Sequence, residues 1–342
     1  MGALVQPVVS SAEPPQPAGH PLSVSVIIPA RDAAATLGAC LRALGPQAEA
    51  VEGAEVIVVD DGSVDDTAHV AERGAARVVR GPATGPAGAR NAGIRASRGE
   101  VLVFLDADTA PAPAWLAQTL APFDDPRVVA VKGRYRTEQR SLLARFSQLE
   151  FEWKYDRLRR AATVDYVDTG TAAFRRSALD QVGGFDESLR ASEDVDLAYR
   201  LARSGGRIVF NPDAVVLHHH TDDLPGYILK KFRAGYTRAL VYERHPDKAL
   251  GDAYTPPLMG VQIGLAGLLP LAVAARALGG GAWGWPWRVI AALFAASTLP
   301  VARLALATDP GVAPVVPAFA FTRAFAQGLG IAAALARRVR RP

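Results

Sequence analysis

Short apolar runs alternate with helical patterns from Ser23 to about Leu217, and this alternation constrains the fold more than any other feature. SVSVIIP (23–29), EVIVVD (55–60) and EVLVFLD (100–106) are typical of buried strands, and the segments between them show helical spacing. Strands separated by helices predict a mostly parallel sheet covered on both faces. Ligands of such sheets bind at the carboxyl ends of the strands.

Acidic residues stand where two of these strands end. Asp60 and Asp61 close the second run, and Asp106 and Asp108 close a later one. We therefore expect both pairs at one edge of the sheet. Residues two apart in an extended segment face the same side, so Asp106 and Asp108 can approach one Mg²⁺ or Mn²⁺ ion. A solvated turn is the alternative for an isolated D-x-D.

The stretch DDGSVDDT (60–67) fits neither of two common acidic sites. It lacks the alternating acids and final Glu of an EF-hand, and the first strand is not followed by the glycine pattern of a dinucleotide fold. Asp60 and Asp61 remain as ligand-binding acids at a strand end. Asp65 and Asp66 are instead expected to begin a helix over Thr67 to Arg73, where carboxylates meet the positive end of the helix dipole.

A third acidic site precedes the apolar face of a predicted helix. Ser192 is the expected N-cap, with Glu193 and Asp194 in the first turn. The acids either stabilise the helix start or provide a base toward a substrate hydroxyl. Both interpretations stay open from these residues alone.

Three histidines end the apolar run AVVLH. Only His218 and His220 would share one face of a strand, so the segment alone cannot form a three-histidine metal site. One of them, with His218 the candidate, either joins Asp106 and Asp108 around a cation or lies in a solvated turn.

The composition changes beyond about Thr255. We predict membrane spans at 258–278 and 287–307, and at 315–336 either a third span or an interfacial helix. Tryptophans at 283, 285 and 287 are typical of a membrane–water interface. A buried helical hairpin in a soluble protein is the alternative.

These features divide the 342 residues into three parts. We expect a disordered tail at 1–21, a catalytic domain at 22–245 and a membrane-associated helical region at 246–342. The formal charge of +4 is matched by four arginines within 337–341, so the rest is nearly neutral and we predict no nucleic-acid partner. Cys40 is the only cysteine, which excludes an intramolecular disulfide.

Seven segments, in this order, resemble the family 2 inverting glycosyltransferases with the GT-A fold. The segments are VSVIIPARD (24–32), EVIVVDDGSVDDT (55–67), GPAGARNAGI (85–94), GEVLVFLDADTAP (99–111), GTAAFRRSALDQVGGFDESL (170–189), SEDVDLAYRL (192–201) and NPDAVVLHH (211–219). The resemblance implies a GT-A α/β domain with a Rossmann-like sheet and a nucleotide-sugar donor.

The resemblance also implies roles for individual residues. Asp194 matches the catalytic base, with Glu193 beside it, and Asp106 and Asp108 match the metal-binding D-x-D, with His218 as a further metal candidate. The expected donor-binding residues are Pro29, Arg31, Asp60, Asp61, Arg90 and Asp106. The acceptor side is expected near Gly170 and Thr171.

The sequence departs from many relatives at two places. Arg31 stands where an aromatic residue is common, which leaves the donor base less defined. The Q-x-x-R-W pattern of processive synthases is replaced by LKKFR (229–233), which favours a single transfer.

The apolar C-terminal region predicts attachment to the cytoplasmic membrane with the catalytic domain facing the cytosol. A lipid-linked or glycan acceptor is the expected partner. The rival functions are a nucleotidyltransferase-like enzyme, which should show a Gly-rich basic loop after the first strand, and a catalytically silent membrane scaffold.

Overall fold

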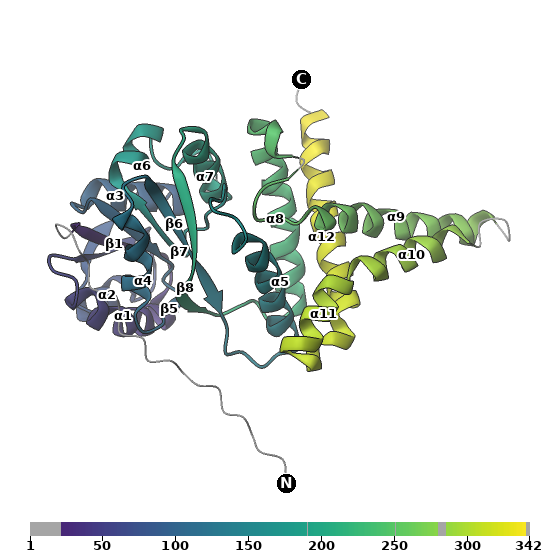
Figure 1. Ribbon diagram of the computed structural model, residues 1–342, viewed down its shortest axis with the longest axis horizontal. Coiled ribbons are helices and arrows are strands. Elements are labelled where there is room, and N and C mark those ends of the chain that lie inside the picture. Colours follow the sequence, from purple (N-terminus) through teal and green to yellow (C-terminus); the bar gives the residue numbers. More distant parts are fainter. Residues whose placement is uncertain (1–21, 190, 250, 280–284, 340–342) are drawn as a thin grey trace, which may run out of the picture.

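The computed structural model describes residues 22–189, 191–249, 251–279 and 285–339, so the tail expected at 1–21 lies outside the described residues. One eight-stranded sheet in the order β3-β2-β1-β4-β7-β6-β8-β5 forms the centre of the catalytic domain (Figure 1). Its strands are β1 (Val24–Ala30), β2 (Glu55–Asp60), β3 (Arg77–Arg80), β4 (Val101–Leu105), β5 (Thr109–Pro111), β6 (Val128–Arg136), β7 (Thr171–Arg175) and β8 (Arg207–His218).

The sheet is parallel in its first half and mixed in its second. β3, β2, β1 and β4 run parallel, as the sequence predicts. β7 is antiparallel to both β4 and β6, while β8 is parallel to β6 and antiparallel to β5. The expected parallel pairing therefore holds for β3, β2, β1 and β4, whereas β7 and β5 run antiparallel to their neighbours.

Alternating side chains of the inner strands feed two hydrophobic cores, one on each face of the sheet. Ile57 and Val59 of β2 lie in one core and Val58 in the other, as the two-residue period of a strand requires. Helices α1 (Ala34–Glu49), α2 (Thr67–Arg73) and α4 (Trp115–Leu120) contribute to the second core. Helices α3 (Pro86–Ala96), α6 (Arg176–Val182) and α7 (Glu193–Arg203) contribute to the first.

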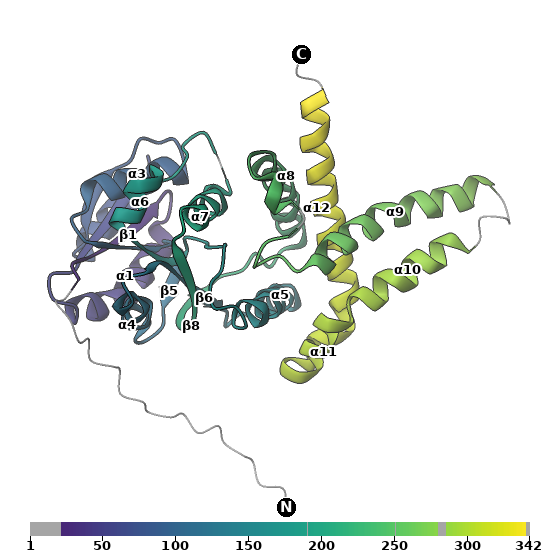
Figure 2. The ribbon, with the colours of Figure 1, turned by 45° about the horizontal axis from the view of Figure 1, so that its top comes forward.

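Two long helices connect this domain to the C-terminal region. They are α5 (Leu142–Leu158) and α8 (Leu224–Arg244), and α8 runs beside α12 (Val316–Val339) in both ribbon views (Figures 1 and 2). A third core joins Leu143 and Phe146 of α5 with Tyr227 of α8 and with residues of the C-terminal helices. Short 3₁₀ helices lie at Ala121–Asp124, Pro246–Lys248 and Pro310–Val315.

The packed core of the catalytic domain continues past the domain boundary expected at residue 245. Tyr254 is buried in the core that contains α7, and Asp252 is buried beside Arg238 of α8, with their charged atoms 3.3 Å apart. The segment around these residues thus anchors the start of the apolar region to the catalytic domain.

Helices α9 (Pro257–Gly279) and α10 (Pro286–Ser297) project together away from the catalytic domain (Figure 2). By length and composition two helices of the described chain can cross a membrane, over Pro257–Leu278 and Pro310–Arg337. The segment predicted as a span at 287–307 differs from the expectation, because α10 and α11 (Leu299–Thr308) meet there at a bend of 41°. If α10 and α11 together count as one broken span, the described chain has three candidate membrane spans.

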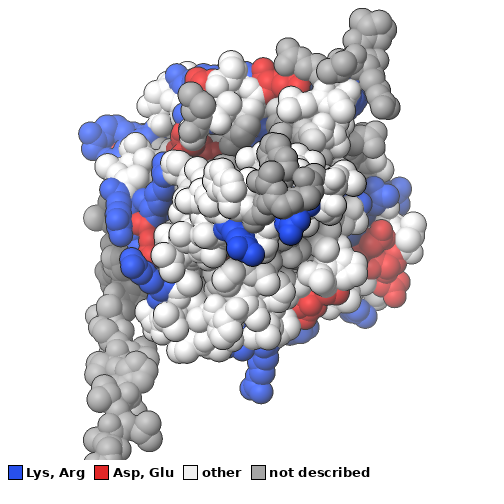
Figure 3. Space-filling model, turned by 90° about the vertical axis from the view of Figure 1, so that its right-hand side faces the viewer, with Lys and Arg blue, Asp and Glu red and all other residues white. Residues whose placement is uncertain are grey.

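The surface of the C-terminal helices is largely apolar. Figure 3 views the molecule from the end that carries these helices and shows a broad uncharged area interrupted by few basic groups. The exposed large apolar side chains of the C-terminal helices include Val261, Leu268, Leu271, Val273, Leu278, Val289, Leu293, Leu299, Leu306, Leu329 and Leu335. Such an area is far more extensive than scattered surface hydrophobics and indicates an apolar partner.

Candidate active site

The acidic strand ends meet at one edge of the sheet. Asp60 is the last residue of β2 and lies opposite Ala30 of the neighbouring β1, and Asp106 directly follows β4 on the other side of β1. The parallel register of these three strands brings their carboxyl ends together. The predicted convergence of the two acidic pairs is therefore present.

Arg90 connects the D-x-D segment to the start of α7. It is a buried residue of α3 whose guanidinium lies 3.4 Å from Asp106 Oδ1 and forms an ion pair with Glu193. Because the guanidinium is planar and carries several donors, it can bind two carboxylates at once. Asp106 of the D-x-D and Glu193 at the start of α7 thus belong to one cluster.

The start of α7 differs in detail from a capped helix. Ser192 occupies the N-cap position, but it has a left-handed backbone with φ of 63° and its side chain makes no capping hydrogen bond. Its hydroxyl instead shares a hydrogen bond of 2.9 Å with Thr237 of α8. The expected capping role of Ser192 is wrong, since the side chain fixes the position of α7 against α8.

Asp194 follows Glu193 and has an unusual pKa. Burial raises the pKa of Asp194 to about 7, and the negative charge of Glu193 adds to the rise, while Arg90 opposes it. Asp194 Oδ1 accepts a hydrogen bond of 2.8 Å from the Val195 amide. A carboxylate with this pKa is suited to accept a proton near neutral pH.

Asp61 organises the loop between β3 and α3. It is buried, and its two carboxylate oxygens accept hydrogen bonds from the amides of Ala83 and Gly85, at 2.8 and 2.9 Å. Asp60 accepts from the Ser63 amide at 2.9 Å. Of the other predicted donor residues, Pro29 lies in β1 and Arg31 is exposed just after it.

The two D-x-D carboxylates differ in exposure and surroundings. The Asp106 side chain is partly exposed and Asp108 is exposed, and burial raises the pKa of Asp106 while Arg90 lowers it. The described residues contain no group of three His, Cys, Asp or Glu side chains arranged to hold a metal. A site with only two protein carboxylates leaves room for phosphate oxygens.

His218 lies near this pair through strand pairing. Its position in β8 is opposite Thr109 of β5, the residue after Asp108. Its Nδ1 lies 3.0 Å from that of His220, and burial lowers its pKa to about 4. Whether His218 binds a metal stays a prediction.

Comparison with known proteins identifies the family. Residues 25–183 match the profile described as Glycosyl transferase family 2. The chain is 34% identical over 287 residues to a pre-mycofactocin glycosyltransferase of Mycobacterium tuberculosis, an alignment that covers 79% of this chain and 59% of that protein. It is also 30% identical over 190 residues to an uncharacterized glycosyltransferase of Mycobacterium bovis, covering 55% of this chain and 82% of that protein. This chain belongs to glycosyl transferase family 2.

A solved relative shares the fold of this glycosyltransferase. A mannosyltransferase from Pyrobaculum calidifontis, in complex with GDP-Man and Mn²⁺, superimposes with a TM-score of 0.64 at 24% identity, over 89% of this chain and 86% of that one. The predicted GT-A fold is confirmed by this match, and the family assignment agrees with the predicted transferase class.

The two residues expected on the acceptor side of this glycosyltransferase have different surroundings. A Cβ at Gly170 would lie 2.5 Å from Asp106 Oδ2 and 2.1 Å from the Tyr135 hydroxyl, so glycine allows the backbone to pass beside the D-x-D. Thr171 is fully buried and accepts a hydrogen bond of 2.9 Å from Trp115 Nε1. Thr171 thus packs in the core beside Trp115, and its place on the acceptor side stays a prediction.

One buried ion pair escaped the sequence analysis. Lys132 of β6 is 0% exposed, and its Nζ lies 2.6 Å from Asp168 Oδ2. The negative charge of Asp168 raises the pKa of both Asp106 and Asp194, so Asp168 lies within electrostatic reach of the cluster. A lysine inside an apolar strand, VVAVKGRYR, was the available signal, because an unpaired charge there would be costly.

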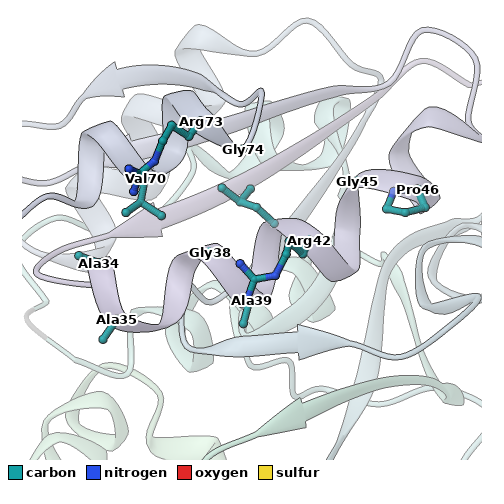
Figure 4. Close-up of a pocket in the computed structure, with 11 residues that line it drawn as sticks. Ala34, Ala35, Gly38, Ala39, Arg42, Gly45, Pro46, Val70, Arg73 and Gly74 are labelled. Atoms are coloured by element: carbon teal, nitrogen blue, oxygen red, sulfur yellow. The ribbon is translucent and has the colours of Figure 1, made fainter.

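A hollow of about 580 Å³ lies between α1 and α2, away from the strand-end acids (Figure 4). Small residues such as Gly38 and Ala39 line it together with Arg42 and Arg73. None of its lining residues is a predicted site residue.

Proposed function

We propose that this glycosyltransferase moves a sugar from a nucleotide-diphosphate sugar to a hydroxyl or phosphate of a lipid-linked or glycan acceptor, with inversion at the anomeric carbon. The observation that carries the proposal is the bridge made by Arg90 between Asp106 and Glu193. It joins a candidate diphosphate site to a candidate base in one cluster.

The donor is proposed to lie along the edge formed by β2, β1 and β4. Asp60 and the loop that Asp61 holds would bind the nucleoside, and Asp106 with Asp108 would hold Mg²⁺ or Mn²⁺, with His218 as a further ligand candidate. A bound divalent cation would neutralise charge on the departing nucleoside diphosphate. The mannosyltransferase that shares the fold was solved with GDP-Man and Mn²⁺, which supports this assignment.

Asp194 is proposed as the general base. It accepts the proton of the acceptor hydroxyl while the acceptor oxygen attacks the anomeric carbon opposite the leaving diphosphate. Asp194 directly follows Glu193, which Arg90 joins to Asp106, and burial raises the pKa of Asp194 to about 7. A single displacement of this kind inverts the configuration.

The acceptor is proposed to arrive from the membrane. The apolar helix α12 packs onto α5 and α8 next to the catalytic domain, and α9 packs onto α12, so a lipid-linked acceptor could reach the site from the bilayer. We place the catalytic domain on the cytosolic face of the cytoplasmic membrane, where nucleotide sugars are available.

Release of nucleoside diphosphate tests the proposed function. The purified protein is offered a panel of nucleotide sugars with Mg²⁺ or Mn²⁺, with and without membrane lipid extract. We expect metal-dependent release from at least one donor, stimulated by the extract. Absence of release from every donor in both conditions contradicts the proposal.

The base assignment has its own test. Asp194→Asn is expected to keep donor binding, measured by calorimetry, and to lose transfer by roughly 10²-fold or more, the usual contribution of a general base. Unchanged turnover would remove Asp194 from this role.

A further inference from the structure

Glu150 lies at the junction between the catalytic domain and the apolar helices, and two cations already neutralise it. It is buried in α5, where Oε2 accepts a hydrogen bond from Lys231 of α8 at 2.8 Å and Oε1 accepts one from Arg323 of α12 at 2.7 Å. Tyr227 of α8 adds a hydroxyl contact of 3.3 Å to Oε2. The carboxylate of Glu150 therefore has little capacity for a further cation.

Lys154, one helical turn after Glu150, has no anionic partner of its own. Among the described residues no carboxylate lies within ion-pair distance of its ammonium, which instead lies 4.5 Å from the ring centre of Tyr254 and 5.5 Å from that of Phe151. Its side chain is half-buried. Burial and the nearby charge of Lys231 lower its pKa to about 7. Two cations thus contact Glu150, and Lys154 stands one helical turn away without a carboxylate within ion-pair distance among the described residues.

A fourth cation extends this charge toward the donor site. Lys230 of α8 is exposed, and Lys231, Asp108 and Asp106 are close enough for their charges to act on it. Lys231 contacts Glu150, Lys154 follows Glu150 by one helical turn, and Lys230 precedes Lys231 on α8 within electrostatic reach of the D-x-D. We call these three lysines, Lys154, Lys231 and Lys230, the basic strip.

We propose that this basic strip is an anion subsite, centred on Lys154, which binds the phosphate group of a lipid-linked acceptor. A bound anion would favour the protonated form of Lys154, and a phosphate offers several acceptor oxygens to ammonium donors. The position of the basic strip sets the orientation of the acceptor. The phosphate lies on the strip and the lipid chain lies toward α9 and α12. The reacting end of the acceptor faces the D-x-D. The inference rests on the proposed lipid-linked acceptor.

The test compares three ligands on the full-length protein in detergent. Polyprenyl phosphate, the polyprenol without phosphate and phosphatidylglycerol are titrated, and affinity is taken from the shift of the thermal unfolding midpoint. The variants are Lys154→Met, Lys154→Arg and, as a matched control from the exposed side of α8, Arg233→Met.

We expect wild type to bind polyprenyl phosphate more tightly than polyprenol. Lys154→Met is expected to lose about tenfold or more of this affinity, the worth of one charge-assisted hydrogen bond, whereas Lys154→Arg and Arg233→Met stay near wild type. An equal loss for phosphatidylglycerol would overturn the acceptor assignment in favour of general headgroup binding. No loss in Lys154→Met would overturn the subsite itself.

A measurement on the wild-type protein keeps the inference testable if Lys154→Met does not fold. A lysine with a lowered pKa reacts readily with acylating reagents near neutral pH, and polyprenyl phosphate should protect Lys154 from acetylation, as read by mass spectrometry. Equal acetylation with polyprenyl phosphate and with polyprenol contradicts the inference. Neither measurement uses the donor, so failure of the proposed transfer appears separately, in the nucleoside diphosphate release assay.

Discussion

Asp194 and its neighbours set the expected pH dependence of transfer. The general base proposed at Asp194 is active only when it is deprotonated, and burial raises its pKa to about 7, so kcat/KM should rise with pH through about 7 and level off above it. Replacement of Glu193 by Gln removes a negative charge that raises this pKa. The acidic limb of the pH–rate profile should therefore move to lower pH.

The pH–rate profile of Glu193→Gln tests whether the charge of Glu193 raises the pKa of Asp194. Glu187→Gln, an exposed acid outside the cluster, serves as the control for a general loss of negative charge. A limb that stays at the same pH in Glu193→Gln, or moves to higher pH, contradicts the electrostatic coupling of the two acids.

The buried pair of Lys132 and Asp168 makes a prediction about stability. Lys132→Met leaves the Asp168 carboxylate buried without its cation, which should cost about 3–5 kcal/mol of the free energy of unfolding. The double variant Lys132→Met/Asp168→Asn carries no such charge and should be more stable than Lys132→Met alone. Denaturant titration of the wild type, Lys132→Met, Asp168→Asn and the double variant measures the coupling between the two side chains. If the two single losses of unfolding free energy simply add up to that of the double variant, Lys132 and Asp168 do not stabilise each other.

Among the elements, the loop between β3 and α3 depends most on one side chain. Asp61→Ala removes the acceptor of both the Ala83 and the Gly85 amides, so the loop should lose its fixed shape. We expect weaker binding of the nucleotide sugar, by about tenfold or more if both hydrogen bonds to the charged group matter, with metal binding retained. Calorimetric titrations with the donor and with Mn²⁺ measure the two effects.

Asp66→Ala is the matched control for Asp61→Ala. Asp66 stands at the start of α2 and makes no capping hydrogen bond through its side chain. Donor affinity equal to wild type in Asp61→Ala, or a loss equal to that in Asp66→Ala, would contradict a specific role of Asp61.

The elements also show how far sequence reasoning reached. Periodicity and strand-end position identified β1, β2, β4 and α2 and placed Asp60 and Asp106 at one edge, because these features depend on local spacing. The pairing of Lys132 with Asp168 depends on two segments 36 residues apart that have no common local pattern. The hydrogen bond of Ser192 could not be predicted for the same reason. Its hydroxyl bonds to Thr237, 45 residues further along the chain, instead of capping its own helix.

At the scale of the whole molecule, the apolar surface of the C-terminal helices predicts membrane attachment. Leu268 and Leu271 of α9 are 52% and 67% exposed. A charged residue near the centre of a membrane helix costs about 2.5–3.5 kcal/mol, so Leu268→Glu/Leu271→Glu should shift the protein from the membrane pellet toward the soluble fraction.

Val64→Glu is the control for this experiment, because Val64 is the most exposed large apolar side chain of the catalytic domain, at 94%. It should stay in the membrane pellet. Wild-type protein that remains soluble after lysis without detergent would contradict the membrane assignment.

The central claim is a single inverting displacement performed by the cluster of Asp106, Arg90, Glu193 and Asp194. The most direct measurement is proton NMR of the first transferred sugar, with Mg²⁺ and the donor identified by diphosphate release, because the coupling at the anomeric proton reports its configuration. We predict a product whose anomeric configuration is opposite to that of the donor. A first product with retained configuration would contradict the account.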